Sequence, residues 1–327
     1  MSSFTLHVVC PNPALDRLQV VEHFHPFEVN RVTAVRTLPG GKGMIVARGA
    51  RRLGATVTAY GFLGGASGEV IRRGCADLGV QDRHVEVTGE TRVTPVVIER
   101  STGRSTVLNE RGPEVTARDT ERLLAVLATE VQPGDVLVST GSLPPGSGAD
   151  LHARIARTAL ARGATVLVDA HGDALVRVLD DLRAEPVTGR FVVKPNADEL
   201  AGVLGHPLPD RDATGAAVRE LHADTGATLV VTLGTDGAVF FDGTVELTAD
   251  TPTVETVNAT GSGDSFLAGL AVALGDGEPP ATALALAAAM GAANAASLTP
   301  DIDPELVARL RHLVTVERVE PGAVASR

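Results

Sequence analysis

The sequence has little of three residue types, and each shortage limits what the protein can do. Aromatic residues make up 3% of its 327 residues, and the formal net charge is −11. Nucleic-acid surfaces use basic patches and stacking rings, so this composition argues against a nucleic-acid partner. The two cysteines, Cys10 and Cys75, provide no disulfide framework and are compatible with a reducing compartment. We therefore expect a cytoplasmic protein.

Long hydrophobic runs are also missing. The first residues, MSSFTLHVVCPN, lack the basic region and the apolar stretch of a signal peptide. The most apolar late segment, ATALALAAAMGAANAASL, is alanine-rich and is interrupted by Gly291 and Asn294. This pattern favours a closely packed core helix over a membrane span. We expect no membrane partner.

Lysine is the third scarce residue type. Of the 29 basic residues, only Lys42 and Lys194 are lysines. A coding bias toward arginine explains this ratio by itself. Both lysines nevertheless lie in motif-like words, PGGKGM and VVKPNADEL, where a compact charge on a flexible side chain is a distinct chemical choice.

The apolar pattern predicts an α/β fold. Short β-branched runs are separated by segments of helical length, and such strands form mostly parallel sheets that are covered on both faces. In sheets of this kind, ligands bind at the carboxyl ends of the strands. The chain is long enough for one large unit with a small appendage. The predicted strands are 5–10, 56–64, 135–142, 165–170, 190–196 and 228–234.

Two segments break the alternation of strand and helix. Residues of about 17–37 and 90–111 alternate in polarity and have no helix between their short strands. We predict that they form a small β-sheet inserted into a core made of 1–16, 38–89 and 112–327. Such a sheet either covers a substrate or is a surface ornament, and the pattern leaves both interpretations open.

The stretch NATGSGDSFLAG, residues 258–269, places a glycine-rich turn before an apolar helix. Such a turn directs unpaired backbone N–H groups and the positive end of the helix dipole at one point, which favours anion binding. Asp264 lies in this turn. Its carboxylate can serve as a base, or the turn can be an ordinary helix cap.

Two later words also have two interpretations. In VVKPNADEL, Asn196 and Glu199 follow a strand and begin a helix, so they either cap it or order the water shell of Mg²⁺. In VVTLGTDGAVFF, Gly234 and Gly237 allow the backbone to approach a ligand, or they form a tight hairpin.

The N-terminal words add polar groups. CPNPALD places Asp16 just after the first strand, and LPGGKGMIVARGARRLG places Gly40, Gly41 and Gly43 ahead of a helix. Together they offer a carboxylate for hydroxyl groups, a backbone cradle and a lysine, as a polyol or sugar phosphate requires. The chain has no Walker A sequence, and no G-x-G-x-x-G follows the first strand.

Eight words occur in order over nearly the whole chain: NPALD, EVNRV, GGKG, GFLGG, GSLPPG, VKPNADEL, TLGTDGA and GSGDS. The chain thereby resembles the PfkB (ribokinase-like) carbohydrate kinase family, and most closely its 1-phosphofructokinase and tagatose-6-phosphate kinase branch. The resemblance implies a ribokinase-like three-layer α/β/α sandwich with a small β-sheet lid. It also implies ATP and Mg²⁺, a sugar or sugar phosphate as the acceptor, and in several relatives a homodimer formed through the lid.

The resemblance also implies roles for individual residues. Asp264 would be the catalytic base, and the backbone of Gly261, Ser262 and Gly263 would hold charge on the transferred phosphoryl group. Glu199 would act on Mg²⁺ through water. The implied ATP-binding residues are Lys194, Asn196, Thr232, Gly234, Gly237 and Asn294. The implied substrate-binding residues are Asp16, Gly40, Gly41, Lys42, Arg92 and Ser142.

Three positions depart from the pattern of this branch. Ile45 and Thr94 replace asparagines, and Val96 replaces a lysine, all on the acceptor side. An aliphatic side chain cannot make the two hydrogen bonds of an amide. We therefore keep three hypotheses: a kinase of a sugar phosphate, a kinase of an unphosphorylated sugar or nucleoside, and a catalytically silent sugar-binding protein with the same fold.

Overall fold

The computed structural model describes residues 4–187, 191–299 and 301–319. Within these ranges, eleven strands form the central sheet, in the order β15-β14-β13-β12-β11-β10-β9-β1-β4-β5, with β6 also paired to β4. The strands from β12 to β5 run parallel, whereas β13, β14 and β15 are antiparallel additions at one edge. The strands are β1 (Thr5–Cys10), β4 (Thr56–Leu63), β5 (Gln81–Asp82), β6 (Val85–Glu86), β9 (Val136–Thr140), β10 (Thr165–Asp169), β11 (Phe191–Val193), β12 (Thr228–Thr232), β13 (Ala238–Phe241), β14 (Glu246–Ala249) and β15 (Val316–Arg318).

Each of the six predicted strands is present, which confirms the mostly parallel sheet. Residue 190 of the predicted strand 190–196 lies outside the described residues, as do residues 1–3, 188–189, 300 and 320–327 of the predicted core. The strands are buried because successive side chains enter opposite layers. In β1, Leu6 and Val8 pack into one hydrophobic cluster and Val9 packs into the other.

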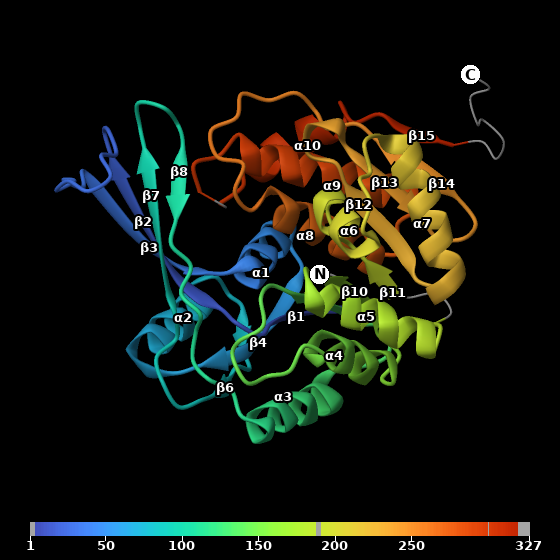
Figure 1. Cartoon of the computed structure of the whole chain (residues 1–327), viewed down its shortest axis with the longest axis horizontal. Coiled ribbons are helices and arrows are strands. Elements are labelled where there is room, and N and C mark those ends of the chain that lie inside the picture. Colours follow the sequence, from blue (N-terminus) through green and yellow to red (C-terminus); the bar gives the residue numbers. More distant parts are fainter. Residues whose placement is uncertain (1–3, 188–190, 300, 320–327) are drawn as a thin grey trace.

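The helices cover both faces of the central sheet and complete three layers (Figure 1). One layer contains α1 (Lys42–Arg52), α2 (Gly65–Asp77), α8 (Ser262–Gly275), α9 (Pro280–Ala295) and α10 (Pro304–Arg311). The other contains α3 (Ala117–Glu130), α4 (Leu151–Leu160), α5 (Asp173–Ala184), α6 (Ala197–Leu204) and α7 (Arg211–Thr225). No helix in the described ranges has the length and apolar character needed to cross a bilayer.

Helix α4 shows how the sequence sets the ends and the buried face of an element. Leu151 and Ile155, one helical turn apart, are fully buried in the hydrophobic cluster on their side of the sheet. Full burial of such a side chain stabilises the fold by roughly 1.5–3 kcal/mol. The helix ends at Leu160, three residues before Gly163, whose φ of 80° is a conformation that glycine adopts easily.

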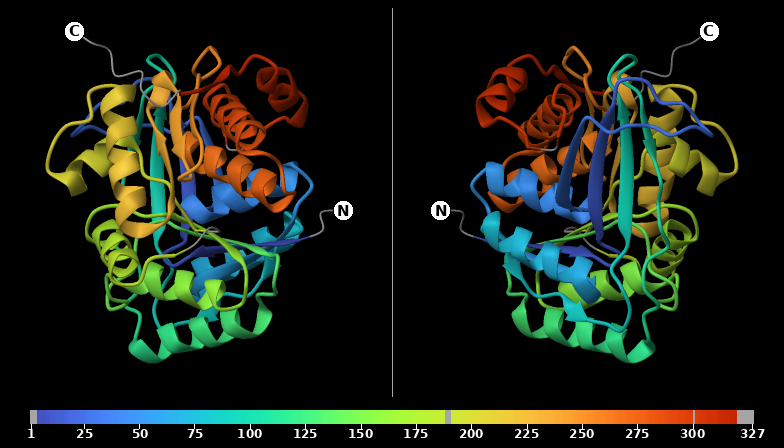
Figure 2. Two further views of the ribbon diagram at one scale, coloured as in Figure 1. Left: turned by 90° about the vertical axis from the view of Figure 1, so that its right-hand side faces the viewer. Right: turned by 90° about the vertical axis from the view of Figure 1, so that its left-hand side faces the viewer.

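A separate four-stranded sheet stands at one side of the molecule (Figures 1 and 2). This small sheet has the order β3-β2-β7-β8, and its strands are β2 (Ala14–Val21), β3 (Ala34–Gly40), β7 (Val93–Glu99) and β8 (Ser105–Val107). The two segments predicted to break the α/β pattern supply most of it. Its strands extend further into the predicted core than expected, because β2 begins at Ala14 and β3 ends at Gly40. Asp16 therefore lies within β2.

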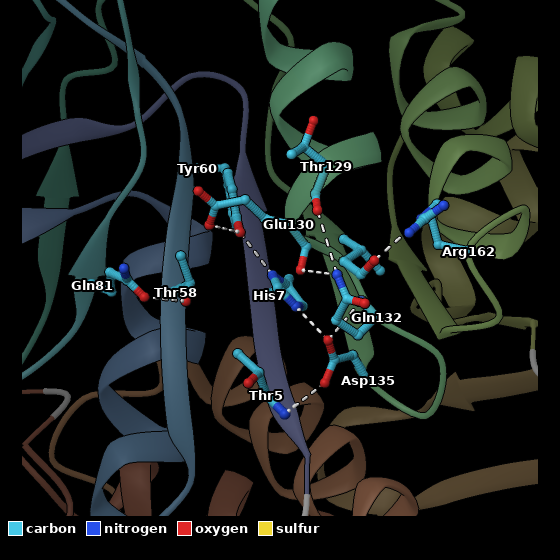
Figure 3. A network of polar contacts seen from close by, with 11 residues as sticks. Thr5, His7, Thr58, Tyr60, Gln81, Thr129, Glu130, Gln132, Asp135 and Arg162 are labelled. Carbon is cyan, nitrogen blue, oxygen red and sulfur yellow. Dashed lines mark hydrogen bonds and ion pairs between the residues drawn. The ribbon is translucent and has the colours of Figure 1, made fainter.

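A largely buried polar network joins β1, β4, α3 and the turn that precedes β9 (Figure 3). The His7 ring nitrogens contact Tyr60 Oη at 2.8 Å and Asp135 Oδ2 at 3.0 Å. Tyr60 donates to Glu130 at 3.4 Å, and Asp135 Oδ1 accepts from the Thr5 N–H at 2.9 Å. Buried polar groups that are satisfied in this way specify one arrangement of the strands. Thr5 and Asp135 lie at the amino-terminal ends of β1 and β9, so this part of the network is remote from the carboxyl ends of the strands.

Candidate active site

Two cavities lie at the carboxyl ends of the parallel strands. We name them after one lining residue each. The Asp16 cavity, of about 680 Å³, is lined by Asn12, Asp16, Gly41, Lys42, Ile45, Arg92, Thr94, Val96, Val107, Asn109, Glu110, Arg111, Gly141, Ser142, Leu143, Pro144, Pro145, His171, Thr260, Gly261 and Asp264. The Phe266 cavity, of about 470 Å³, is lined by Asn196, Thr232, Gly234, Thr235, Gly237, Thr251, Pro252, Thr253, Val254, Thr256, Ala259, Ser262, Gly263, Phe266, Ala288, Gly291, Ala292 and Ala295.

The glycine-rich turn separates the two cavities. Gly261 and Asp264 face the Asp16 cavity, whereas Ser262 and Gly263 face the Phe266 cavity. Gly261 is the N-cap residue of α8 and has a φ of 85°. In the described part of the chain, the backbone N–H groups of Gly261, Gly263 and Asp264 have no protein acceptor. The turn therefore offers free donors at the positive end of a helix, between two cavities.

Asp264 is a buried carboxyl group among charged neighbours. Its side chain is 6% exposed, and burial raises its pKa to about 7, with Asp169 and Glu199 adding to the rise. Lys42 and Lys194 act in the opposite direction and favour the ionised form. A pKa near neutrality is suitable for a group that accepts a proton during a reaction.

The only two lysines of the chain converge on one carboxylate. Lys42 Nζ lies 3.7 Å from Asp169 Oδ2, and Lys194 Nζ lies 3.7 Å from Asp169 Oδ1. Lys42 Nζ also lies 4.0 Å from Glu199 Oε1. Burial lowers the pKa of Lys42, but the nearby carboxylates Asp169, Asp264 and Glu199 outweigh it and raise the pKa overall. Lys42 is therefore held protonated beside Asp264.

Asp16 projects from β2 into the Asp16 cavity. Gly40 makes room for it, since a Cβ on Gly40 would lie 2.0 Å from the Asp16 carboxyl carbon. Gly40 does not itself line the cavity; Gly41 does. Burial raises the pKa of Asp16 to about 6, and Arg92 opposes this rise.

Arg92 and Ser142 both line the Asp16 cavity, and both contact Asn12. Arg92 donates to the Asn12 carbonyl oxygen through Nε at 3.1 Å and Nη2 at 2.9 Å, and to the Glu110 carbonyl oxygen at 3.4 Å. Asn12 Nδ2 donates to Ser142 Oγ at 3.2 Å and to the Arg111 carbonyl oxygen at 3.1 Å. The buried Asn12 thus ties the first strand to the loop after β8 and to the loop after β9.

Thr232, Gly234, Gly237 and Asn196 all line the Phe266 cavity, as expected for one binding region. Gly237, with a φ of 93°, closes the hairpin between β12 and β13, and a Cβ there would lie 1.8 Å from the Ala249 carbonyl oxygen. The stretch VVTLGTDGAVFF therefore forms a hairpin and also lines a cavity, so both of its interpretations apply.

Asn196 and Glu199 form a capping box on α6. Asn196 Oδ1 accepts from the Glu199 N–H at 2.8 Å, and Glu199 Oε2 accepts from the Asn196 N–H at 2.9 Å. The capping role that the sequence left open is thus present. Glu199 Oε1 takes no part in the box and points to the charged cluster, 4.0 Å from Lys42 Nζ.

The donor set fits a hydrated Mg²⁺ better than a fully protein-bound metal. Among the residues that the structure describes, no group of three or more His, Cys, Asp or Glu side chains could hold a metal ion. Mg²⁺ keeps several waters and needs one or two carboxylates. Glu199 Oε1, which takes no part in the capping box, is available for that purpose, whereas Asp169 Oδ1 is buried and faces Lys194 Nζ at 3.7 Å.

Two predicted ATP-binding residues do not line the Phe266 cavity. Lys194 is 3% exposed and lies behind the cavities, on Asp169. Asn294 is 2% exposed, and its amide bonds to the glycine-rich turn and to α8. The helix that carries it does supply a wall of the cavity, through Gly291, Ala292 and Ala295.

All three positions that depart from the branch pattern line the Asp16 cavity. Ile45 lies against the turn, since a Cβ on Gly261 would meet Ile45 Cδ1 at 2.9 Å. Thr94 is buried, and its hydroxyl has no hydrogen-bond partner among the residues that the structure describes. Ile45 and Val96 therefore make part of this cavity apolar.

Sequence reasoning missed several polar residues of the site, among them Asn12, Arg111 and Asp169. Asp169 carried a usable signal, because it ends the apolar run TVLVD and so comes at the carboxyl end of a strand. Asn12 lay within a quoted word but had no chemical feature to single it out. Arg111 is one of many arginines, and only the fold places it in the Asp16 cavity.

An α/β sandwich with two cavities on either side of a glycine-rich turn, whose free N–H groups can accept an anion, suits an enzyme that transfers a charged group between two bound molecules. The chain belongs to the pfkB family of carbohydrate kinases, because the sequence pattern of the pfkB family carbohydrate kinase matches residues 9–303. The resemblance that was predicted from eight ordered words is thereby confirmed.

Individual relatives agree with this assignment. The chain is 34% identical over 265 residues to the 1-phosphofructokinase of Xanthomonas campestris pv. campestris, covering 81% of this chain and 82% of that protein. It is 32% identical over 285 residues to the tagatose-6-phosphate kinase of Staphylococcus epidermidis, covering 87% and 90%. A solved structure of phosphofructokinase-2 from Escherichia coli in complex with fructose-6-phosphate has a TM-score of 0.85 and 26% identity, covering 96% of this chain and 99% of that one.

Proposed function

We propose that the protein transfers a phosphoryl group from ATP to a hydroxyl group of a sugar phosphate, with Asp264 as the base. The observation that carries this proposal is the position of the GSGD turn. The turn forms a wall of both cavities, and its free N–H groups lie where a phosphoryl group would pass from one to the other. The Phe266 cavity would hold the nucleotide and the Asp16 cavity the acceptor.

Asp264 accounts for the proton in this reaction. The acceptor hydroxyl gives its proton to the ionised Asp264 as its oxygen forms a bond to the γ-phosphorus. The bond from that phosphorus to the bridging oxygen breaks, and ADP leaves with the electron pair. A base whose pKa lies near neutrality is effective in such a step, and its contribution is roughly 10²–10⁴-fold.

The charged cluster would neutralise the phosphates. Lys42 lines the acceptor side and remains protonated, while Lys194 and Asp169 hold the cluster from behind. Glu199 Oε1 would hold a hydrated Mg²⁺ through its waters, and this ion neutralises charge on the phosphate oxygens when it is bound. Positioning and charge compensation, rather than covalent chemistry, make up most of the catalysis of phosphoryl transfer.

Arg111 supports a phosphorylated acceptor. The Asp16 cavity has two arginines, and Arg92 donates three hydrogen bonds to backbone carbonyl groups. Arg111 is exposed, and in the described ranges its guanidinium has no side-chain partner, while its own carbonyl oxygen is anchored by Asn12. A guanidinium of this kind can bind a phosphate with two parallel hydrogen bonds. It offers a positive charge in a cavity where Val96 replaces the lysine of the branch.

The second candidate is a kinase of an unphosphorylated sugar or nucleoside. Val96 favours it, since this apolar side chain lines the acceptor cavity where the branch has a lysine, and the cavity thereby loses a positive charge for an acceptor's phosphate. A catalytically silent binding protein would have no use for a buried carboxyl group poised near neutral pKa between two cavities.

We also propose that the small sheet covers the acceptor and pairs with a second copy of the chain. Four successive residues of β3, 34–37, are exposed, so neither face of this strand is covered. Of nine exposed large apolar side chains in the described residues, six belong to the small sheet and its loops: Phe27, Val29, Val32, Val35, Val107 and Leu108.

A reducing cytoplasm would suit the protein, because both cysteines are free and buried.

The proposed function is tested by ATP turnover against a panel of acceptors. The panel contains fructose 1-phosphate, fructose 6-phosphate, tagatose 6-phosphate, free ketohexoses and nucleosides, and ADP release is measured. We expect turnover with a sugar phosphate. In Asp264→Asn we expect kcat to fall by roughly 10²–10⁴-fold while the affinity for ATP, measured by calorimetry, stays nearly constant. Activity restricted to unphosphorylated acceptors would establish the second candidate instead.

The variant Arg111→Gln tests the role of Arg111 in binding the acceptor. It should raise KM for the phosphorylated acceptor by roughly 10–100-fold, as expected for the loss of one charged hydrogen-bonding partner. The matched control is Arg104→Gln, a change near the tip of the small sheet and outside both cavities. An unchanged KM in Arg111→Gln would remove this residue from the acceptor site.

A further inference from the structure

Asn294, near the C-terminal end of α9, is the most completely hydrogen-bonded side chain at the glycine-rich turn. Its Nδ2 donates to the Thr260 carbonyl oxygen at 2.9 Å and to Ser262 Oγ at 3.2 Å. Its Oδ1 accepts from Ser265 Oγ at 3.2 Å. The side chain is 2% exposed, so the amide forms these contacts away from solvent.

These contacts lie on both sides of Gly261. Thr260 precedes it, while Ser262 and Ser265 follow it in the first turn of α8. Gly261 has a φ of 85°, and such a conformation at the entrance of a helix needs support from its surroundings. The Asn294 amide spans the bend and holds the residues on each side of it at the same time.

The backbone of α9 adds to this support. The Ala295 carbonyl oxygen accepts from the Val257 N–H at 2.8 Å and from the Asn258 N–H at 3.0 Å. The end of α9 therefore carries the whole segment from Val257 to Ser262. The three N–H groups without a protein acceptor, those of Gly261, Gly263 and Asp264, belong to the part of the turn that Asn294 fixes.

We infer that Asn294 is a positioning residue for phosphoryl transfer. The inference rests on the proposed function and gives a role outside both cavities to a residue that the resemblance implied for ATP binding. Its amide contacts neither cavity. By fixing the bend at Gly261, it sets the direction of the free N–H groups and the position of the Asp264 carboxylate on the first turn of α8. Misplacement of such groups by about 1 Å costs roughly 10²-fold in rate.

The test compares Asn294→Leu and Asn294→Asp with two other changes in α9. Asn294→Leu removes both donors and the acceptor, and Asn294→Asp keeps the shape and the acceptor for Ser265. Thr282→Ala, in the first turn of the same helix and outside both cavities, is the neutral control. Ala292→Leu narrows the Phe266 cavity and reports what damage to a nucleotide wall looks like.

Three quantities are measured for each variant: kcat at saturating ATP, the Kd for ADP by calorimetry, and amide hydrogen exchange of residues 257–265. For both Asn294 variants we expect kcat to fall by roughly 10²-fold, Kd for ADP to stay within about threefold, and exchange in 257–265 to accelerate. Ala292→Leu should instead raise Kd for ADP by about tenfold or more and leave exchange unchanged.

The opposite pattern would overturn the inference. If Asn294→Asp weakens ADP binding by about tenfold with unchanged exchange, the residue is a nucleotide wall. If kcat and exchange both stay at the wild-type level, the contacts are dispensable. Should the wild-type protein phosphorylate no acceptor in the panel, the proposed function fails, but exchange and ADP binding still decide whether Asn294 holds the turn.

Discussion

Asp264 binds a proton more tightly in the folded protein than in an unfolded chain, and this difference has a consequence for stability. Burial raises its pKa from 3.8 to about 7. A group with a raised folded-state pKa contributes stability that is complete below its unfolded pKa and is lost as the pH rises through its folded pKa. For Asp264 the loss occurs between about pH 4 and pH 7.

The prediction is a pH-dependent difference between the wild-type protein and Asp264→Asn. Between about pH 5.5 and about pH 8, the wild type should lose about 2 kcal/mol of unfolding free energy relative to the variant, which does not titrate at this position. Denaturant unfolding at the two pH values measures it. Asp16 titrates in the same range but is common to both proteins, so it cancels. If the difference in unfolding free energy between the wild type and Asp264→Asn is the same at both pH values, Asp264 is ionised throughout this range.

Single residues also show where sequence reasoning stops. The glycine-rich turn and Asp264 were predictable, because a local word contains both the helix entrance and the carboxylate. The role of Asp169 was not, because it depends on β10 lying next to β11 in the sheet, which brings Lys194 to one carboxylate oxygen, and on α1 bringing Lys42 to the other. Convergence of this kind is a property of topology rather than of spacing.

At the scale of elements, helix capping does not use up the polar atoms of the residues that perform it. The sequence offered helix capping as an alternative to function for Asn196 and Glu199. The structure shows a complete capping box, with the second carboxylate oxygen of Glu199 left over for the charged cluster. The predicted start of the first helix was too late. Gly43 was expected ahead of this helix, but it lies inside α1, which begins at Lys42.

The hairpin of β12 and β13 leads to a prediction about Gly237. Its φ of 93° and the approach of the Ala249 carbonyl oxygen leave no room for a side chain. Gly237→Ala should lower the unfolding free energy by about 1–3 kcal/mol and weaken ATP binding, because Thr232 and Gly234 of the same hairpin line the Phe266 cavity.

The matched control is Gly202→Ala in α6, where an added Cβ would meet nothing within 4 Å. This change should raise the unfolding free energy by up to about 1 kcal/mol, because alanine is the better helix former. Both values come from denaturant titrations. Equal effects of the two changes would mean that the hairpin rearranges around the new side chain.

At the scale of the whole molecule, the small sheet carries most of the large apolar side chains that remain exposed to solvent in the described residues. Its apolar side chains include Phe27, which is fully exposed, and Val29, which is 87% exposed. Patches of this kind mark interaction sites. The sequence indicated the inserted sheet through its alternating polarity, but the direction in which each side chain faces required the strand register.

We expect the protein to sediment as a dimer at micromolar concentration, and Phe27→Asp combined with Val29→Asp to shift it toward monomer. A charge in an apolar interface has to be desolvated without a partner, which opposes association. Leu313→Asp, at another exposed apolar position, should leave the dimer intact. A wild-type protein that sediments as a monomer would contradict the proposed pairing.

The convergence of both lysines on Asp169 has one more consequence, for chemical labelling. Arginine supplies the remaining basic side chains, so the side-chain primary amines of the whole sequence are two, and both lie within the charged cluster. Lys194 is 3% exposed, while the side chain of Lys42 is 35% exposed and borders the acceptor cavity. Apart from the chain terminus, an amine-directed probe therefore has one accessible target. Because the pKa of Lys42 is raised, this amine reacts only at alkaline pH, where its protection by a ligand reports on the occupancy of the site.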